Sequence, residues 1–281
     1  MSQEIASALR WAQGQFDSIS DSARLDAELL LAHCLQKPRS YLYSWPEQEL
    51  PTSVHSEFEI LVAQRLKPTP LAYLLVSREF YSLEFKISPV ALIPRPETEL
   101  LVDTTLQLCA GLQRPRILEM GTGTGIISIV LLKEKPDIDL VTTDISKACL
   151  ELATTNARIH QVSLHCLQSD WYQALTALPG FDLIVSNPPY IAANDPYLSQ
   201  GDLPAEPLLA LTPGKTGLES IEKIVAGAPQ HLNPGGYLIF EHGYDQAEAV
   251  EALLTTTGFT NIQNLLDDNQ LPRVSLGQLP Y

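Results

Sequence analysis

The spacing of hydrophobic residues divides the chain into a helical first part and a mixed second part. Up to about residue 75, apolar side chains recur at helical spacing in 24–36, RLDAELLLAHCLQ, and in 53–68, SVHSEFEILVAQRLKP. The buried face of the first of these helices is predicted to hold the following residues or their neighbours: Leu25, Leu29, Ala32 and Leu35. Proline cannot continue a helix, so the second helix is predicted to stop at Pro68.

A change of period marks the second part. Residues 78–94, REFYSLEFKISPVALIP, alternate apolar and polar positions, which is typical of a half-buried hairpin. The segment 94–111, PRPETELLVDTTLQLCAG, predicts a helix with a proline near its first turn and Gly111 at its end. We therefore predict a helical domain over 1–77, a hairpin linker over 78–95 and a larger domain over 96–281.

Strand and helix patterns alternate through the larger domain. Strands are predicted at 116–120, 139–144, 164–168, 181–186 and 236–243, and helices at 124–135, 147–161 and 219–232. Such alternation predicts an α/β fold with a doubly wound, mostly parallel sheet covered by helices on both faces. The region 191–217 is rich in Pro and Asp and has no periodicity, and so long a loop is more often functional than not.

Composition narrows the class of protein. The 281 residues are 45% hydrophobic, enough for a sizeable core, and the net charge of −15 argues against a DNA or structured-RNA binder. A local basic patch can still hide in an acidic total. The four cysteines lack C-x-x-C spacing, so reduced thiols are expected rather than a metal site or disulfides. The N-terminus lacks a signal-peptide pattern, and no apolar run is long enough for a membrane span, which predicts a cytoplasmic protein.

A glycine-rich loop follows the strand at 116–120. Gly121, Thr122, Gly123, Thr124 and Gly125 form G-x-G-x-G, which allows a tight turn and a close approach of a ligand to the backbone at a helix N-terminus. The alternative is a plain structural turn. No lysine follows the loop, so the triphosphate-binding pattern is absent.

Acids after the next two strands point to a nucleoside ligand. Asp144 closes the strand at 139–144 and can accept hydrogen bonds from both ribose hydroxyls, although it could instead cap the following helix. Asp170 and Trp171 follow the strand at 164–168, where they could meet the amino group and the ring of an adenine. For Trp171, an ordinary core position is an equally good interpretation.

The stretch SNPPY ends the strand at 181–186, on the edge where such sheets bind ligands. The side-chain oxygen of Asn187 and a backbone carbonyl can accept both N–H bonds of a planar, conjugated nitrogen and so orient its lone pair. Pro188 has a fixed φ and no N–H, so it can aim its carbonyl without competing as a donor. Tyr190 can stack on a planar group. The alternative is a rigid strand exit.

Together, LEMGTGTG, the ribose acid and NPPY resemble the class I methyltransferases that use S-adenosylmethionine on amide or amino nitrogens. The resemblance is closer to one family. REFYSLEFKISPVALIPRPETELLVD, VSNPPYI, the pair Glu206-Pro207 and GGYLIFEHGYDQ are similar to the peptide chain release factor glutamine methyltransferase family, over nearly the whole chain. The chain departs from that family at Val76, where a glycine is common, at Ala205, where an aromatic residue is usual, and before Arg273, where a glycine is often found.

That resemblance implies methyl transfer to the side-chain amide nitrogen of the glutamine in the Gly-Gly-Gln loop of bacterial class 1 release factors. It implies S-adenosylmethionine as cofactor, S-adenosylhomocysteine as product, and an N-terminal domain that helps to hold the release factor. No metal is expected, because the cysteines and histidines lack ligand spacing. Its cofactor contacts carry over to Gly121, Thr122, Gly123, Thr124, Gly125, Asp144, Trp171 and Asn187. Its substrate contacts carry over to Asn187, Pro188, Pro189 and Tyr190, of which Asn187, Pro188 and Tyr190 are the catalytic candidates.

The expected mechanism is in-line displacement at the sulfonium methyl, in which the protein positions and desolvates the reactants. No strong base is required, so we expect an orienting or structural role for His242. We expect a monomer with no direct nucleic-acid contact. The alternatives are a ribosomal-protein glutamine methyltransferase, a DNA or RNA adenine N6-methyltransferase, and a cofactor-binding interaction module without catalysis.

Overall fold

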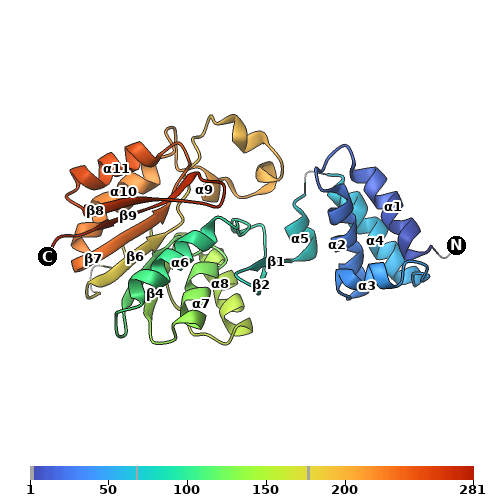
Figure 1. Cartoon of the computed structure of the whole chain (residues 1–281), viewed down its shortest axis with the longest axis horizontal. Helices are drawn as coiled ribbons and strands as arrows, with labels where there is room; N and C mark the ends of the chain where they lie inside the picture. The colour runs from blue at the N-terminus through green and yellow to red at the C-terminus, as the bar shows by residue number, and fades with distance from the viewer. Residues whose placement is uncertain (1–2, 68, 176–177) are drawn as a thin grey trace. The chain divides into compact units, whose positions relative to one another are not determined.

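The computed structural model describes residues 3–67, 69–175 and 178–281 (Figure 1). Contacts within the chain divide it into two compact units, Met1–Ser77 and Arg78–Tyr281. Within the described part of the chain, no helix is both long and apolar enough to cross a membrane.

The first unit is a bundle of helices around its own core. Its helices are α1 (Ile5–Phe16), α2 (Ala23–Leu35), α3 (Arg39–Ser44), α4 (Thr52–Arg65) and α5 (Leu71–Leu75). Helices α1, α2 and α4 bury apolar side chains against one another, among them Phe16, Leu30 and Phe58. Pro68, the predicted end of the second long helix, lies outside the described residues, and that helix ends at Arg65.

The predicted buried face of α2 is partly wrong. Leu25 is 38% exposed, whereas Leu30 and Leu31 are fully buried. Two acids of this helix are buried as well. Asp26 accepts a hydrogen bond from Arg65 at 3.0 Å, and Glu28 lies between two arginines. Because ion pairs let charged residues occupy inward positions, apolar spacing alone could not set this face.

A two-stranded hairpin, β1 (Ser77–Phe80) and β2 (Leu83–Lys86), follows. Beyond Ser77 it belongs to the second unit. The side chain of Asn156 accepts from the backbone N–H of Lys86 at 2.9 Å and donates to its carbonyl at 3.1 Å. Part of the segment predicted as a linker over 78–95 is therefore attached to the sheet domain. The side-chain amide of Asn156 on that domain pairs with both backbone groups of Lys86, as a neighbouring strand would.

The second unit is built on a seven-stranded sheet with the order β5-β4-β3-β6-β7-β9-β8. Its strands are β3 (Arg116–Met120), β4 (Asp139–Asp144), β5 (His165–Gln168), β6 (Phe181–Ser186), β7 (Leu232–Glu241), β8 (Thr260–Leu266) and β9 (Pro272–Gln278). The first five in chain order are parallel, and β9 pairs antiparallel with both β7 and β8. The predicted doubly wound, mostly parallel fold is confirmed.

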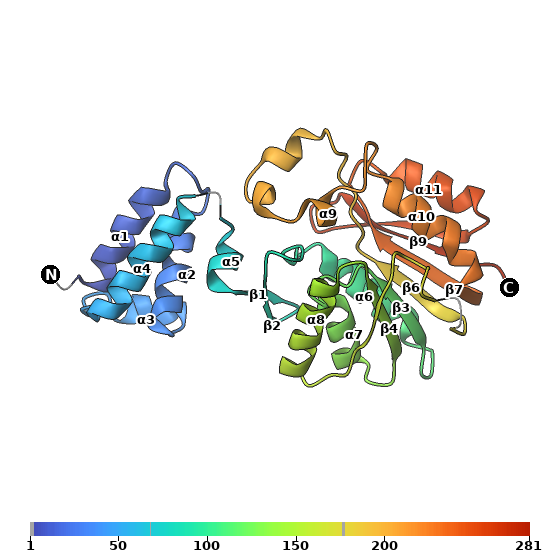
Figure 2. The same cartoon turned by 180° about the vertical axis from the view of Figure 1, so that it is seen from behind.

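Helices cover both faces of this sheet (Figures 1 and 2). They are α6 (Thr98–Cys109), α7 (Ile126–Glu134), α8 (Lys147–Ile159), α10 (Glu219–Gly227) and α11 (Ala247–Thr256). Helices α10 and α11 pack on the face that carries Leu118, Ile184 and Phe240, whereas α6, α7 and α8 lie together on the other side. The central strands are apolar on both faces because both faces are buried.

Two differences from the prediction have local causes. The helix expected over 219–232 ends at Gly227, a 3-10 turn (Ala228–Gln230) follows, and β7 begins at Leu232. Pro229 lies in that turn, where its ring and missing N–H stop an α-helix. The loop at 191–217 contains three short helical turns, η1 (Pro196–Ser199), η2 (Leu203–Ala205) and α9 (Leu208–Leu211).

The strand order reverses at β3, which lies between β4 and β6. In an open α/β sheet, ligands bind in the crevice at the carboxyl ends of the strands where the order reverses. The glycine loop follows β3 and SNPPY follows β6, so both predicted motifs border this crevice.

Candidate active site

A cavity of about 350 Å³ opens at this edge of the sheet. Its walls come from the glycine loop, the ends of β4 and β6, the turn after β5, the segment before α6 and the loop around α9. Six of the predicted site residues that line it are Gly121, Gly123, Asp144, Trp171, Asn187 and Pro189. The fold therefore brings motifs that are far apart in sequence to one hollow.

The glycine loop wraps the end of β3. The N–H groups of Gly121 and Thr122 both donate to the carbonyl of Thr143, at 2.8 and 3.0 Å. Gly121 has φ +78° and Gly123 φ +52°, in the left-handed region that favours glycine, and both line the cavity. The loop thus exposes backbone, rather than side chains, to a ligand.

Gly125 has a different reason to be glycine. It is not among the residues that line the cavity, while Thr122 and Thr124 are. Its φ is +83°, and a Cβ there would lie 2.9 Å from the Cβ of Ala153 on α8. The third glycine of the loop therefore permits close packing of the α7 N-terminus against α8.

Asp144 links the glycine loop to the end of β4. Its carboxylate accepts from the backbone N–H of Gly123 at 2.9 Å and from that of Ser146 at 2.8 Å. Burial raises the pKa of this carboxyl, and the two N–H groups oppose the rise. The cap of α8 is Ser146, whose hydroxyl accepts from the N–H of Cys149 at 3.3 Å. The interpretation of Asp144 as the helix cap is therefore wrong.

The turn after β5 supplies Asp170 and Trp171 to the cavity wall. Trp171 has φ +50°, and the hydroxyl of Ser169 donates to its carbonyl at 2.8 Å. Trp171 also packs against the main core of the sheet domain. Trp171 is therefore part of the core, and its place in the cavity wall leaves contact with an adenine ring as a prediction.

The SNPPY segment leaves β6 with its residues in different environments. Asn187 and Pro189 line the cavity, whereas Pro188 is buried and Tyr190 is half-buried, and neither of these two is among the lining residues. Gln246 donates to the carbonyl of Tyr190 at 2.9 Å, and a Cβ on Gly217 would lie 2.5 Å from the same oxygen. The backbone after the two prolines is thus tightly enclosed.

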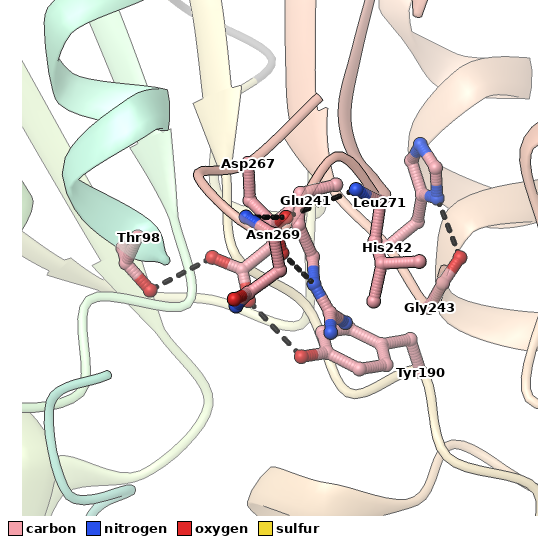
Figure 3. A network of polar contacts seen from close by, with 9 residues as sticks. Thr98, Tyr190, Glu241, His242, Gly243, Asp267, Asn269 and Leu271 are labelled. Atoms are coloured by element: carbon pink, nitrogen blue, oxygen red, sulfur yellow. Dashed lines mark hydrogen bonds and ion pairs between the residues drawn. The ribbon is translucent and has the colours of Figure 1, made fainter. Parts of the chain in front are cut away.

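A buried carboxylate, which the sequence did not single out, lies beside this segment (Figure 3). Glu241 ends β7 and is 1% exposed. Its Oε2 accepts from the hydroxyl of Thr98 at 2.7 Å, and its Oε1 accepts from the hydroxyl of Tyr190 at 3.0 Å. Thr98 Oγ1 in turn accepts from the side-chain Nδ2 of Asn187 at 3.0 Å. Burial raises the pKa of Glu241, while Thr98, Tyr190 and the charge of Arg273 oppose the rise.

His242 makes hydrogen bonds that suit a structural role. It is fully buried, and its Nδ1 lies 2.8 Å from the carbonyl of Gly243 (Figure 3). Its Nε2 lies 2.7 Å from the hydroxyl of Ser275. Burial lowers the pKa of the imidazole, which favours the neutral form. His242 is not among the residues that line the cavity, in agreement with the expected orienting or structural role.

A second buried carboxylate braces the glycine loop from below. Glu119 on β3 is fully buried, and its Oε2 accepts from three hydroxyls, those of Thr122, Ser128 and Thr142. Burial raises the pKa of Glu119 to about 7. The signal in the sequence was an acid inside the otherwise apolar strand RILEM, a position that a buried strand rarely gives to a charge.

The sheet order and the cavity at the switch point are those of the class I methyltransferase fold. Solved structures of similar fold include the catalytic domain of hMettl16, with TM-score 0.59 and 17% identity over 79% of this chain and 82% of that one. Another is the 16S rRNA methyltransferase RsmC of T. Thermophilus, with TM-score 0.53 and 20% identity over 72% of this chain and 49% of that one.

Sequence comparison narrows the class to one family. Residues 7–75 match the family described as PrmC N-terminal domain, and residues 96–199 match Methyltransferase small domain. The release factor glutamine methyltransferase of Vibrio cholerae is 45% identical over 99% of this chain and 98% of its own length. That of Pseudomonas aeruginosa is 44% identical over 92% of this chain and 94% of its own. The chain belongs to the release factor glutamine methyltransferase family.

Proposed function

We propose that the chain transfers a methyl group from S-adenosylmethionine to the side-chain amide nitrogen of the glutamine in the Gly-Gly-Gln loop of class 1 release factors. The observation that carries this proposal is the position of Asn187. Its side chain lines the cavity at the end of β6, and Thr98 holds its Nδ2 at 3.0 Å. An amide oxygen is left to accept an N–H from a substrate amide.

The residues around the cavity fit the cofactor. A volume of about 350 Å³ suits a small ligand. Each carboxylate oxygen of Asp144 accepts one hydrogen bond from a backbone N–H. Lone pairs on both oxygens therefore remain for ribose hydroxyls. Ile145 and Trp171 both line the cavity and offer apolar walls to an adenine ring. Gly121, Thr122, Gly123 and Thr124 form the floor, with Gly125 supporting it through packing.

When bound, S-adenosylmethionine supplies an electrophilic methyl group on a sulfonium. The chain's own part is to present the nucleophile. Asn187 Oδ1 accepts one N–H bond of the substrate amide. The carbonyl of Pro188, which does not itself line the cavity but lies between the lining residues Asn187 and Pro189, accepts the other, and the nitrogen lone pair then turns toward the methyl group. Pro189 and Tyr190 enclose the planar amide. Holding the two reactants in this orientation lowers the barrier by up to ~7–11 kcal/mol. As the nitrogen–methyl bond forms, the sulfonium–methyl bond would break, and S-adenosylhomocysteine would leave with the electron pair on its sulfur. The methylated nitrogen is then cationic and acidic enough to give its proton to water, so no strong base is needed.

The proposed partner is a protein. A net charge of −15 disfavours a nucleic-acid substrate, which would repel an acidic chain. We assign the first unit to docking of the release factor, with the chain acting as a monomer in the cytoplasm, where translation takes place. A whole release factor is then a better substrate than free glutamine, and equal rates for the two would contradict docking.

The test is transfer of labelled methyl from S-adenosylmethionine to a purified release factor. A factor whose loop glutamine is replaced by alanine is the substrate control, and Asn187→Ala is the enzyme control. We expect label on the first factor only, and at least a ~100-fold loss with Asn187→Ala. If the enzyme binds the cofactor but puts no label on the release factor, its substrate would be another protein, such as a ribosomal protein, or a nucleic acid.

A further inference from the structure

We propose that Glu241, acting through Thr98, is a positioning residue that determines which end of the Asn187 amide faces the substrate. This inference rests on the proposed function, because it concerns the group that accepts the substrate's N–H. It extends that function to residues that come from three separate parts of the fold, α6, the segment after β6, and β7.

The order of donors and acceptors carries the inference. An ionised carboxylate only accepts hydrogen bonds, so the single hydroxyl proton of Thr98 is committed to Glu241, at 2.7 Å. Thr98 Oγ1 can then only accept from Asn187. The Asn187 side chain must turn its NH₂ group toward Thr98, at 3.0 Å, and its Oδ1 remains for the substrate. An acceptor end at the cavity is thus dictated by a carboxylate that does not touch it.

The same carboxylate also holds the other side of the substrate segment. The hydroxyl of Tyr190 donates to Oε1 of Glu241 at 3.0 Å, so Asn187 and Tyr190 are both tied to one buried group. Thr98 and Glu241 are each 1% exposed. The arrangement is enclosed, and water cannot replace either hydrogen bond without entering the core.

Reversal of this order would place a donor where an acceptor is needed. If Glu241 became an amide whose NH₂ faced Thr98, the Thr98 hydroxyl would be free to donate to Asn187. The Asn187 side chain could then turn its NH₂ group toward the N–H of the substrate. Two donors facing each other lose the hydrogen bond and leave the substrate nitrogen without orientation.

The experiment compares four variants in the labelled-methyl assay with the whole release factor. Thr98→Val removes the hydroxyl at constant shape, Thr98→Ser keeps it, and Glu241→Gln keeps the shape but replaces the carboxylate. Thr105→Val is the matched control, because Thr105 is a buried residue of the same helix whose hydroxyl donates to the helix carbonyl of Leu101 at 2.7 Å and, within the described part of the chain, makes no contact with the site. For each, kcat, KM, cofactor affinity by calorimetry and melting temperature are measured.

We expect Thr98→Val and Glu241→Gln to lower kcat by about 10- to 100-fold, with cofactor affinity unchanged. Thr98→Ser should remain within about threefold of the wild type, and Thr105→Val should match it. A folded Thr98→Val or Glu241→Gln enzyme with wild-type kcat would overturn the inference. So would a Thr98→Ser enzyme as slow as Thr98→Val, because packing would then explain the loss. If Thr98→Val does not fold, Glu241→Gln decides alone. No label with the wild-type enzyme would instead refute the proposed function.

Discussion

The glycine loop and the SNPPY segment each rest on a buried glutamate, but the two glutamates are satisfied in different ways. Glu119 gathers three hydroxyls on one oxygen, while its Oε1 has no partner among the described residues. Glu241 receives one hydroxyl on each oxygen and lies near the positive charge of Arg273. The pKa of Glu119 rises to about 7 through burial, so this residue is protonated over much of the weakly acidic range.

The difference indicates two purposes for a buried acid. All three partners of Glu119 come from the turn, helix and strand around the glycine loop, so Glu119 braces the loop that we propose binds the cofactor. The partners of Glu241 are Thr98, which holds Asn187, and Tyr190 of the SNPPY segment, so its proposed role is to set the direction of hydrogen bonds in the site. Substitutions around Glu119 and the glycine loop should therefore change mainly the free energy of unfolding. Substitutions around Glu241 and the SNPPY segment should change mainly kcat.

The largest effect on stability is expected from Gly125→Ala, which breaks the packing beneath the glycine loop. The new Cβ would lie 2.9 Å from Ala153 Cβ and 3.1 Å from its Cα, at a φ of +83°. We expect a loss of about 3 kcal/mol in the free energy of unfolding, measured by denaturant titration. Gly111→Ala is the control, since nothing lies within 4 Å of a Cβ there, and it should change stability by less than about 0.5 kcal/mol. Equal losses of unfolding free energy in the two variants would show that packing of Gly125 against Ala153 does not stabilise the loop.

The next effect concerns Glu119→Gln and pH. The folded-state pKa of Glu119 is raised from 4.5 to about 7, so its contribution to stability is complete below pH 4.5 and is lost as the pH rises through 7. Glutamine does not titrate. Between pH 5 and pH 8, the variant should therefore gain about 2–3 kcal/mol relative to the wild type.

Unfolding free energies at both pH values check this prediction, with the exposed Glu47→Gln as the control. Parallel pH profiles of the wild type and Glu119→Gln would mean that Glu119 is ionised throughout, and the contrast with Glu241 would disappear.

A smaller effect is expected from Arg273→Met, which removes the positive charge near Glu241. Arg273 lowers the pKa of that carboxyl against the effect of burial, while Glu97 raises it. Without Arg273, the pKa of Glu241 should rise further, so protonation should remove the carboxylate at a higher pH. We expect the acid limb of the kcat profile to move to higher pH.

The profile is measured in the labelled-methyl assay, with Arg10→Met, an exposed arginine, as the control. Arg273→Met also loses the hydrogen bond from Arg273 to Asp267 at 3.3 Å, which should lower its unfolding free energy by about 1–2 kcal/mol. An acid limb that stays in place would show that Glu241 is not the titrating group.

The smallest effect is expected at Val76, which lies outside both glutamate networks and measures backbone strain alone. Val76 ends α5 with φ +57°, a left-handed conformation that a β-branched residue disfavours. Val76→Gly should stabilise the protein by about 0.5–1 kcal/mol. Val90→Gly, at an exposed position that does not have a positive φ, should destabilise it by a similar amount, as thermal unfolding of both variants can show.

Much of the sheet could be predicted because its strands carry local signals. The strand patterns at β3, β4, β5 and β6, and the glycine loop after the first of them, are each short and continuous in sequence. The antiparallel edge formed by β8 and β9 was not predicted. In TNIQNLL and PRVSLGQ, polar residues interrupt the apolar pattern. Only β8 is the edge strand, and it is largely exposed or half-buried, whereas β9 lies between β7 and β8 with polar Ser275 among its buried residues.

The sequence by itself determined the alternation of strands and helices, the glycine loop, Asp144 and the SNPPY segment. Each of these features can be predicted from residues that are close together in the sequence. Only the tertiary structure decided what holds them. Thr98 meets Asn187 across 89 residues of chain and Glu241 across 143. Nothing in the sequence around Thr98, at the start of α6, indicates which residues its hydroxyl binds. Its bonds exist because sheet order and helix packing bring three segments together and exclude water from between them.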